Sequence, residues 1–209
     1  AGVASTLYQI INYRKVAENL GNISDVELLL GILLVHSRKT KEIRVMSETD
    51  ALTGLYNRRA AEDHISRQMQ EDGKNPDCVR PLISIDLDKF KQVNDTYGHL
   101  EGDALLIAVA DTLRTSVRSY DIVGRIGGDE FVVYLSNVTD RQNAMAVAEK
   151  LCQVIRGLST MKKEWSNISA SIGISFADHP DIKMEELYIS ADKAMYSAKG
   201  NGRDQYQTL

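Results

Sequence analysis

Acidic side chains stand at the ends of two predicted strands, where they could bind a cation. They are the two acids that close the stretch PLISIDLD and the two that lie between a Gly-Gly pair and the apolar run FVVYL: Asp86, Asp88, Asp129 and Glu130. Carboxylates gathered at one sheet edge repel one another unless a cation or a shared proton relieves them. Mg²⁺ prefers such oxygen ligands and keeps coordination sites for water and substrate phosphates. If the two strands are neighbours, the pattern predicts a divalent-metal site.

Each of these acids also has an ordinary interpretation, because a single aspartate at a strand end is most often solvated. For Asp86 alone that interpretation is favoured. For Asp86 together with Asp129 and Glu130 the metal site is favoured, since the preceding Gly127-Gly128 turn also lets a ligand approach the backbone closely.

Basic residues near the acids could balance bound phosphates. Lys89 and Lys91 follow the acids at the start of a predicted helix, where free N–H groups also favour phosphate. Lys199 and Arg203 lie at and just beyond the last predicted helix. Their ordinary interpretation is an exposed helix surface or a favourable charge at a helix C-terminus. The chain has no GxxxxGKS/T and no GxGxxG pattern, which argues against P-loop and kinase-like sites.

The segments that must position these residues alternate between helical and strand patterns. Helices are predicted over residues 57–70, 89–98, 101–118, 139–158 and 184–200, and strands over 81–86, 121–126, 130–135 and 167–177. The glycine pair joins two of the strands as a hairpin. This order of elements predicts an α+β fold rather than a doubly wound parallel sheet.

Composition narrows the class of protein. The chain has 209 residues, 43% of them hydrophobic, and a formal net charge of −4, which allows one good core and argues against a nucleic-acid polymer as partner. Cys78 and Cys152 belong to no CxxC pair or Cys/His cluster, so they are expected to be reduced thiols of a cytoplasmic protein. The most apolar window, residues 28–35, is too short to span a bilayer, and no membrane contact is expected from this segment.

The first 49 residues are predicted to be helical, and the charged run 36–44 suits a solvated helix face or a connecting helix between modules. The chain begins AGVAST without an initiator Met, which is compatible with the cytosolic part of a longer protein. The apolar window 28–35 suits a dimer seam and a helix packed on the core equally well, and both interpretations stay open.

From Asp50 onward the chain resembles the GGDEF family of diguanylate cyclases, bacterial enzymes that make cyclic di-GMP from GTP. Five motifs carry the resemblance, in order: DALTGLYNRR, DLDKFKQVNDTYGHLEGD, RSYDIVGRIGGDEF, SIGIS and ADKAMYSAKGNGRD. The resemblance implies that residues 50–209 form the catalytic domain, and that residues 1–49 are a helical extension or linker from an upstream regulatory module, as in a longer, membrane-anchored sensor. It also implies a central, mostly antiparallel five-stranded sheet flanked by helices.

The resemblance implies a site for two Mg²⁺ ions, with Mn²⁺ as an alternative, at the signature turn. Its ligands would be the Asp86 carboxylate, the Leu87 backbone carbonyl, and the Asp129 and Glu130 carboxylates. Asp129 and Glu130 would also be the catalytic residues that help to activate the attacking hydroxyl. Two such ions stabilise the attacking and leaving oxygens of a phosphoryl transfer.

For the substrate GTP, the resemblance implies that Asn94 and Asp103 recognise guanine. A carboxylate can accept from guanine N1–H and N2–H, donors that adenine lacks, and a buried acceptor left unpaired costs about 1–3 kcal/mol. The remaining residues expected in the substrate site are Lys89, Phe90, Lys91, Gly127, Gly128, Lys199 and Arg203.

The resemblance also implies the reaction and its control. Two GTP molecules, each held by one copy of the domain, would condense with release of pyrophosphate, so activity would require a homodimer. Arg118 and Asp121 of RSYD match the family's inhibitory site for cyclic di-GMP, although an RxxD pattern alone is often a surface ion pair. The alternative is a non-catalytic receptor for GTP or cyclic di-GMP. It is less favoured because degenerate members usually lose a signature acid, and Asp86, Asp129 and Glu130 are all present.

Overall fold

The computed structural model describes residues 48–177, 179 and 181–208, together with positions 15, 31, 33–35 and 37. The chain divides into two units, Ala1–Ser47 and Glu48–Leu209, and the elements discussed below belong to the second. The predicted helical extension over residues 1–49, with its apolar window 28–35, falls largely outside the described residues and stays a prediction. None of the described helices is long and apolar enough to cross a membrane.

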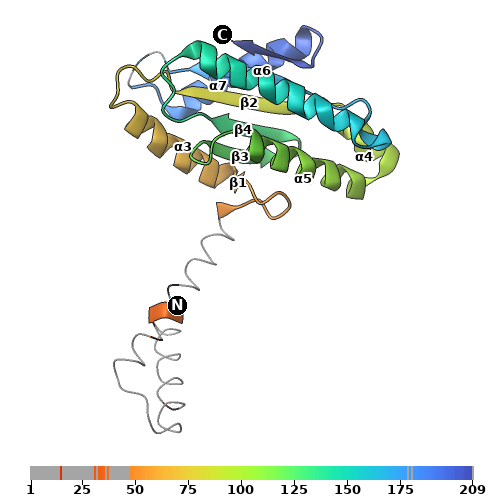
Figure 1. Ribbon diagram of the computed structural model, residues 1–209, viewed down its shortest axis with the longest axis horizontal. Coiled ribbons are helices and arrows are strands. Elements are labelled where there is room, and N and C mark those ends of the chain that lie inside the picture. Colours follow the sequence, from red (N-terminus) through yellow and green to blue (C-terminus); the bar gives the residue numbers. More distant parts are fainter. Residues whose placement is uncertain are drawn as a thin grey trace. The chain divides into compact units, whose positions relative to one another are not determined.

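A six-stranded sheet forms the centre of the second unit (Figure 1). Its strands, in spatial order, are β1 (Tyr56–Asn57), β3 (Ile122–Gly127), β4 (Glu130–Tyr134), β2 (Pro81–Asp88), β5 (Ser169–Phe176) and β6 (Gln205–Thr208). The four inner strands pair antiparallel, whereas β1 and β6 run parallel to their neighbours at the two edges. The predicted α+β class is confirmed, but the sheet is mixed and has one strand more than the predicted five.

The two edge strands lack the hydrophobic pattern by which a strand is predicted. β1 has two residues, too few for any periodicity. β6 reads QYQT, and none of its residues is fully buried. Both strands form because their backbone groups pair with a buried neighbouring strand, which a local pattern does not reveal.

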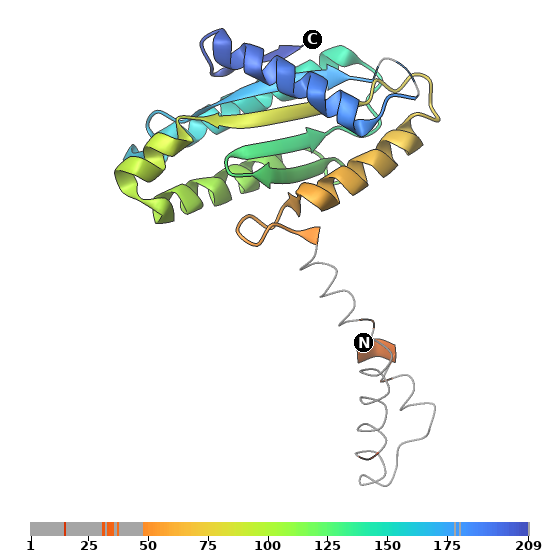
Figure 2. The same cartoon turned by 180° about the vertical axis from the view of Figure 1, so that it is seen from behind.

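Helices cover both faces of the sheet. In the described part of the second unit they are α3 (Arg58–Asp72), α4 (Phe90–Tyr97), α5 (His99–Ser116), α6 (Arg141–Gly157) and α7 (Met184–Gly200), with 3-10 turns at Leu158–Thr160 and Lys163–Trp165. Helices α5 and α6 lie on one face, and α3 and α7 lie on the other, as the two opposite views show (Figures 1 and 2). The side chain of Asp140 accepts from the Gln142 amide and caps the start of α6.

Strand β2 divides its side chains between these two faces. Its odd-numbered apolar side chains enter the core beneath α5 and α6. Ser84 points the other way, toward α7, where its Oγ lies 3.5 Å from the sulfur of Met195. Because strand side chains alternate, Asp86 and Asp88 share the face of Ser84 and meet the end of α7.

Gly173 of β5 lets α7 pack directly on the sheet. A Cβ at this position would lie 2.0 Å from the Ala191 carbonyl O and 2.2 Å from the Met195 amide N, and neither backbone atom can rotate away. We therefore expect Gly173→Ala to lower the free energy of unfolding by about 3 kcal/mol, because overpacking forces the helix off the sheet. Urea unfolding followed by circular dichroism would measure the change.

Gly157→Ala is the matched control for this prediction. A Cβ on Gly157, at the end of α6, would have no atom within 4 Å, so this variant should be as stable as the wild type or slightly more stable. Equal stability of the Gly173→Ala protein and the control would contradict the close packing of α7 on β5.

Candidate active site

The register of two neighbouring strands brings the predicted acids together. Strands β2 and β4 pair antiparallel with Asp86 directly opposite Glu130. At the same edge the Leu87 amide donates to the Asp129 carbonyl O at 3.3 Å. The expectation that the two strands are neighbours is confirmed, and the role of these four residues in metal binding remains a prediction.

Negative charge accumulates where these side chains meet. Asp86 is 9% exposed, and burial raises the pKa of its carboxyl; the Lys199 ammonium opposes that shift, and Asp129 and Asp88 add to it. Burial also raises the pKa of the Glu130 carboxyl, and the charges of Asp86 and Asp129 raise it further. Both carboxylates are therefore more stable beside a positive charge.

Lys199 supplies a positive charge in this structure. Its Nζ lies 2.7 Å from Asp86 Oδ2. Lys199, which was predicted to bind phosphate, thus forms an ion pair with Asp86, which was predicted to bind metal. Among the residues that the structure describes, no three acid, imidazole or thiol side chains form a complete metal cluster by themselves. The carboxylate and carbonyl oxygens at this edge nevertheless suit a hard divalent cation that takes its remaining ligands from phosphates.

Two arginines donate hydrogen bonds to backbone carbonyl groups of the glycine turn and of the residue before it. Gly128 has a φ of +53°, a left-handed value that glycine adopts without strain. Arg125 donates to the Gly128 carbonyl O from Nε at 3.0 Å and from Nη2 at 2.7 Å, and its Nη1 lies 3.0 Å from Asp50 Oδ1. Arg58 Nε donates to the Ile126 carbonyl O at 3.1 Å. The motifs did not predict this clamp, although its charged residues stand inside two of them, DALTGLYNRR and RSYDIVGRIGGDEF.

Asn94 of α4 packs against a glycine of α5. A Cβ on Gly102 would lie 1.9 Å from Asn94 Oδ1 and 2.9 Å from Asn94 Cγ, so only glycine leaves room for the amide. Asp103, the next residue, is exposed. The structure thus places the two residues of the predicted guanine pair on adjoining helices, and it adds Gly102, which the sequence analysis did not select.

The other predicted substrate residues differ in exposure. Both glycines of the turn are exposed, as are Lys89 and Lys91. Lys89 has a φ of 62° where β2 passes into α4. Phe90 is 9% exposed and packs in the core, so it supports the site from beneath. Arg203 lies near the second acid of DLD, its Nε 3.7 Å from Asp88 Oδ1.

Comparison with known proteins decides the family. The family profile described as "Diguanylate cyclase, GGDEF domain" matches residues 47–205. The chain belongs to this family. The recognition from the five motifs is therefore confirmed.

Named relatives and a solved structure agree with this membership of the GGDEF family. The chain is 39% identical over 170 residues to the bifunctional diguanylate cyclase/cyclic di-GMP phosphodiesterase MucR of Pseudomonas aeruginosa, a match that covers 81% of this chain and 24% of MucR. It is 34% identical over 186 residues to the diguanylate cyclase DgcS of Shewanella oneidensis, which covers 88% of this chain and 60% of DgcS. This GGDEF chain thus spans only part of the length of either relative.

The fold of this GGDEF domain matches that of a solved structure. The coiled coil and GGDEF domain of DgcB from Caulobacter crescentus, in complex with c-di-GMP, superposes with a TM-score of 0.75 at 23% sequence identity. The match covers 89% of this chain and 100% of that one. At this identity the likeness establishes the fold.

The RSYD segment of this GGDEF domain lies at the end of β3 opposite to the glycine turn. It forms a turn in which Asp121 accepts from the Arg118 amide at 2.8 Å and from the Ser136 amide at 3.0 Å. The Arg118 guanidinium is exposed and donates to the Tyr120 hydroxyl at 2.9 Å. Arg118 and Asp121 line a cavity of about 480 Å³, together with polar residues that include Lys150.

Proposed function

We propose that this GGDEF domain is an active diguanylate cyclase that condenses two GTP molecules into cyclic di-GMP and pyrophosphate. The observation that carries the proposal is the pairing of Asp86 with Glu130 across two strands, beside Asp129 and the Lys199 ammonium. Membership of the GGDEF family and similarity to named diguanylate cyclases support it.

The proposed site would hold divalent cations, two Mg²⁺ in each domain, on the oxygens of Asp86, Leu87, Asp129 and Glu130. When bound, such cations neutralise phosphate charge and stabilise the attacking and leaving oxygens. Lys199 would then leave Asp86 for a substrate phosphate, because a bound cation would neutralise Asp86 and the phosphate would neutralise Lys199. Arg203, Lys89 and Lys91 would supply further positive charge.

The proposed reaction is an in-line transfer at the α-phosphorus of GTP. In a first transfer the 3′-hydroxyl oxygen of one GTP forms a bond to the α-phosphorus of the other as the bond to the bridging oxygen of the β-phosphate breaks, and one pyrophosphate leaves. The same transfer in the opposite direction closes the ring and releases a second pyrophosphate. Asp129 and Glu130 would help to activate this hydroxyl, which loses its proton as the new bond forms. The protein contributes mainly by positioning the two reactants.

The proposed substrate preference and assembly follow from the site. Asn94 and Asp103 would bind the guanine edge, with Gly102 leaving room for the Asn94 amide. One domain would hold one GTP, so two copies would face each other about a two-fold axis in a cytoplasmic homodimer. Cyclic di-GMP would bind at the cavity of Arg118 and Asp121 and inhibit the enzyme.

Incubation of the chain with GTP and Mg²⁺, followed by chromatography, tests the proposal. The expected result is cyclic di-GMP and pyrophosphate, with no product from ATP or in the presence of EDTA. Light scattering on the same sample reports whether it is dimeric. Absence of product from a dimeric, GTP-binding sample would contradict the proposal and favour the non-catalytic receptor.

Arg118→Ala is expected to relieve inhibition by added cyclic di-GMP. The guanidinium of Arg118 is exposed, and Asp121 is held by the backbone amide of Arg118 rather than by its side chain, so the turn should stay intact. The concentration of cyclic di-GMP that halves the initial rate should rise about fivefold to 150-fold, since a bidentate guanine contact contributes about 1–3 kcal/mol. Inhibition at the wild-type concentration in this variant would remove Arg118 from the proposed inhibitory site.

A further inference from the structure

The loop between α7 and β6 has an unfavourable backbone conformation. Three consecutive residues have positive φ angles: Gly202 at 109°, Arg203 at 67° and Asp204 at 52°. For the two residues other than glycine, such angles are unfavourable and persist only where surrounding contacts impose them. The loop follows Lys199 and contains Arg203, both of which the proposed function assigns to GTP phosphates.

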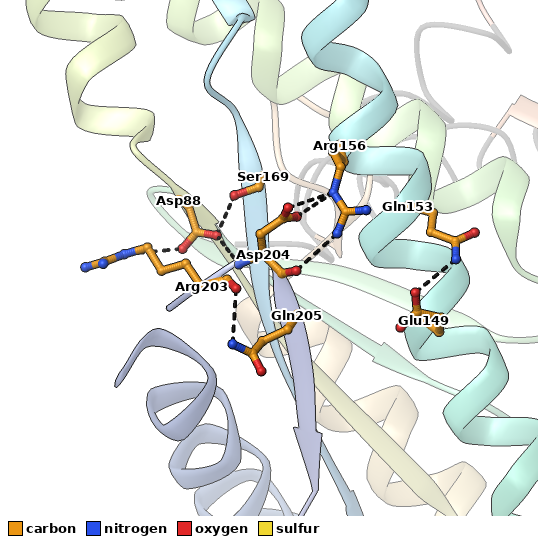
Figure 3. A network of polar contacts seen from close by, with 8 residues as sticks. All are labelled: Asp88, Glu149, Gln153, Arg156, Ser169, Arg203, Asp204 and Gln205. Atoms are coloured by element: carbon orange, nitrogen blue, oxygen red, sulfur yellow. Dashed lines mark hydrogen bonds and ion pairs between the residues drawn. The ribbon is translucent and has the colours of Figure 1, made fainter. Parts of the chain in front are cut away.

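Asp88 holds this loop from inside the sheet. Its carboxylate is 2% exposed and accepts from Ser169 Oγ at 2.7 Å, Ser171 Oγ at 2.7 Å and the Asp204 amide at 3.1 Å. Arg203 Nε lies 3.7 Å from the same carboxylate (Figure 3). With these donors around both oxygens, Asp88 differs from Asp86, whose carboxylate forms an ion pair with Lys199.

Arg156 of α6 holds the same loop from outside. Its Nε lies 2.9 Å from Asp204 Oδ1 and 2.7 Å from Asp204 Oδ2, and its Nη2 donates to the Asp204 carbonyl O at 3.1 Å (Figure 3). The two side chains are 48% and 38% exposed, so the pair lies at the surface and outside the core. Asp204 is thus held through its amide by Asp88, and through its carboxylate and carbonyl by Arg156.

We infer that Asp88 and the Arg156–Asp204 pair are positioning residues for the triphosphate of GTP. They touch neither the nucleotide nor the reacting atoms in the proposed site. They hold residues 202–204 in the left-handed conformation that places Arg203 beside the acid end of β2, which Lys199 reaches from α7. The inference rests on the proposed function, because it needs these two cations to bind phosphate.

The test compares the affinities of the full chain for GTP and for GMP, by calorimetric titration without turnover, in the wild type and in Arg156→Ala. If the loop keeps its binding conformation in only about a tenth of the variant molecules, the apparent GTP affinity falls about tenfold. GMP lacks the outer phosphates, so its affinity should change less than about twofold, because its guanine contacts lie on α4 and α5.

Two further variants sharpen this test. Gln153→Ala removes a side chain one turn earlier on α6 that bonds only Glu149 in Figure 3, so it should leave both affinities unchanged. Arg156→Lys keeps the charge but loses the bidentate geometry, and it should restore part of the GTP affinity. Should Arg156→Ala fail to fold, Asp204→Asn, which tolerates a left-handed backbone, gives the same comparison.

The outcomes separate the inference from the proposed function. Equal loss of GTP and GMP affinity, or no loss of either, in a folded Arg156→Ala protein overturns the inference while the wild type still makes cyclic di-GMP. A wild-type chain that binds no GTP overturns the proposed function and the inference with it. A selective loss of GTP affinity in Arg156→Ala, absent from Gln153→Ala, supports the inference.

Discussion

Replacing Glu130 by glutamine is expected to lower the turnover of GTP about a thousandfold, the scale of losing a main electrostatic contact to the transition state. The change removes one negative charge and one proton acceptor without altering the size of the side chain. Glu130 stands opposite Asp86 in the strand register, where burial and neighbouring acids raise the pKa of its carboxyl. The domain should therefore stay folded, because the substitution relieves repulsion.

Turnover is measured by the initial rate of pyrophosphate release, and folding by the thermal midpoint Tm. We expect the Tm of Glu130→Gln to equal or exceed that of the wild type, since clustered acids that serve function commonly destabilise the fold. Glu149→Gln, the same chemical change at an exposed position of α6, is the control and should leave turnover unchanged. Near-normal turnover in Glu130→Gln would exclude Glu130 from the catalytic site.

Replacing Gly102 by alanine should weaken GTP binding about tenfold to hundredfold, the range expected when guanine loses the hydrogen bonds of one amide. The new methyl group would overlap Asn94 Oδ1, which lies 1.9 Å from the Cβ position. Because the obstructing atoms belong to a rotatable side chain, Asn94 can turn away at little cost. The fold should survive, and helix α5 should gain a few tenths of a kcal/mol from the exchange of glycine for alanine.

The affinity for GTP and the unfolding free energy should thus move in opposite directions in Gly102→Ala. Nucleotide titration measures the first, and urea unfolding the second. Gly157→Ala makes the same exchange at the end of α6, where the new Cβ would have no atom within 4 Å. This control should change stability and leave GTP affinity unaltered. Unchanged GTP affinity in Gly102→Ala would contradict the proposed role of Asn94 in guanine recognition.

The strands that carry the acids were predictable because their information is local. The runs PLISID and EFVVYL have the length and apolar character of buried strands, and the Gly-Gly pair between DIVGRI and DEF marks a hairpin. The structure confirms both strands, as β2 and β4, and the hairpin that joins β3 to β4. The edge strands β1 and β6 were not predictable in the same way, since they are selected by the strand that they pair with.

The amino-acid sequence by itself determined the chemical types at the candidate site: hard oxygen donors, lysines and arginines for phosphate, and glycines at a tight turn. Only the tertiary structure decided which role each of two residues of the same type has. Asp86 and Asp88 look equivalent in DLD, but β5 offers Asp88 two serine hydroxyls and the loop after α7 offers it the Asp204 amide. In the described part of the chain, the Asp86 carboxylate is paired with the Lys199 ammonium. The physical reason is that a carboxylate's role depends on the donors that surround it, and these come from segments distant in the chain.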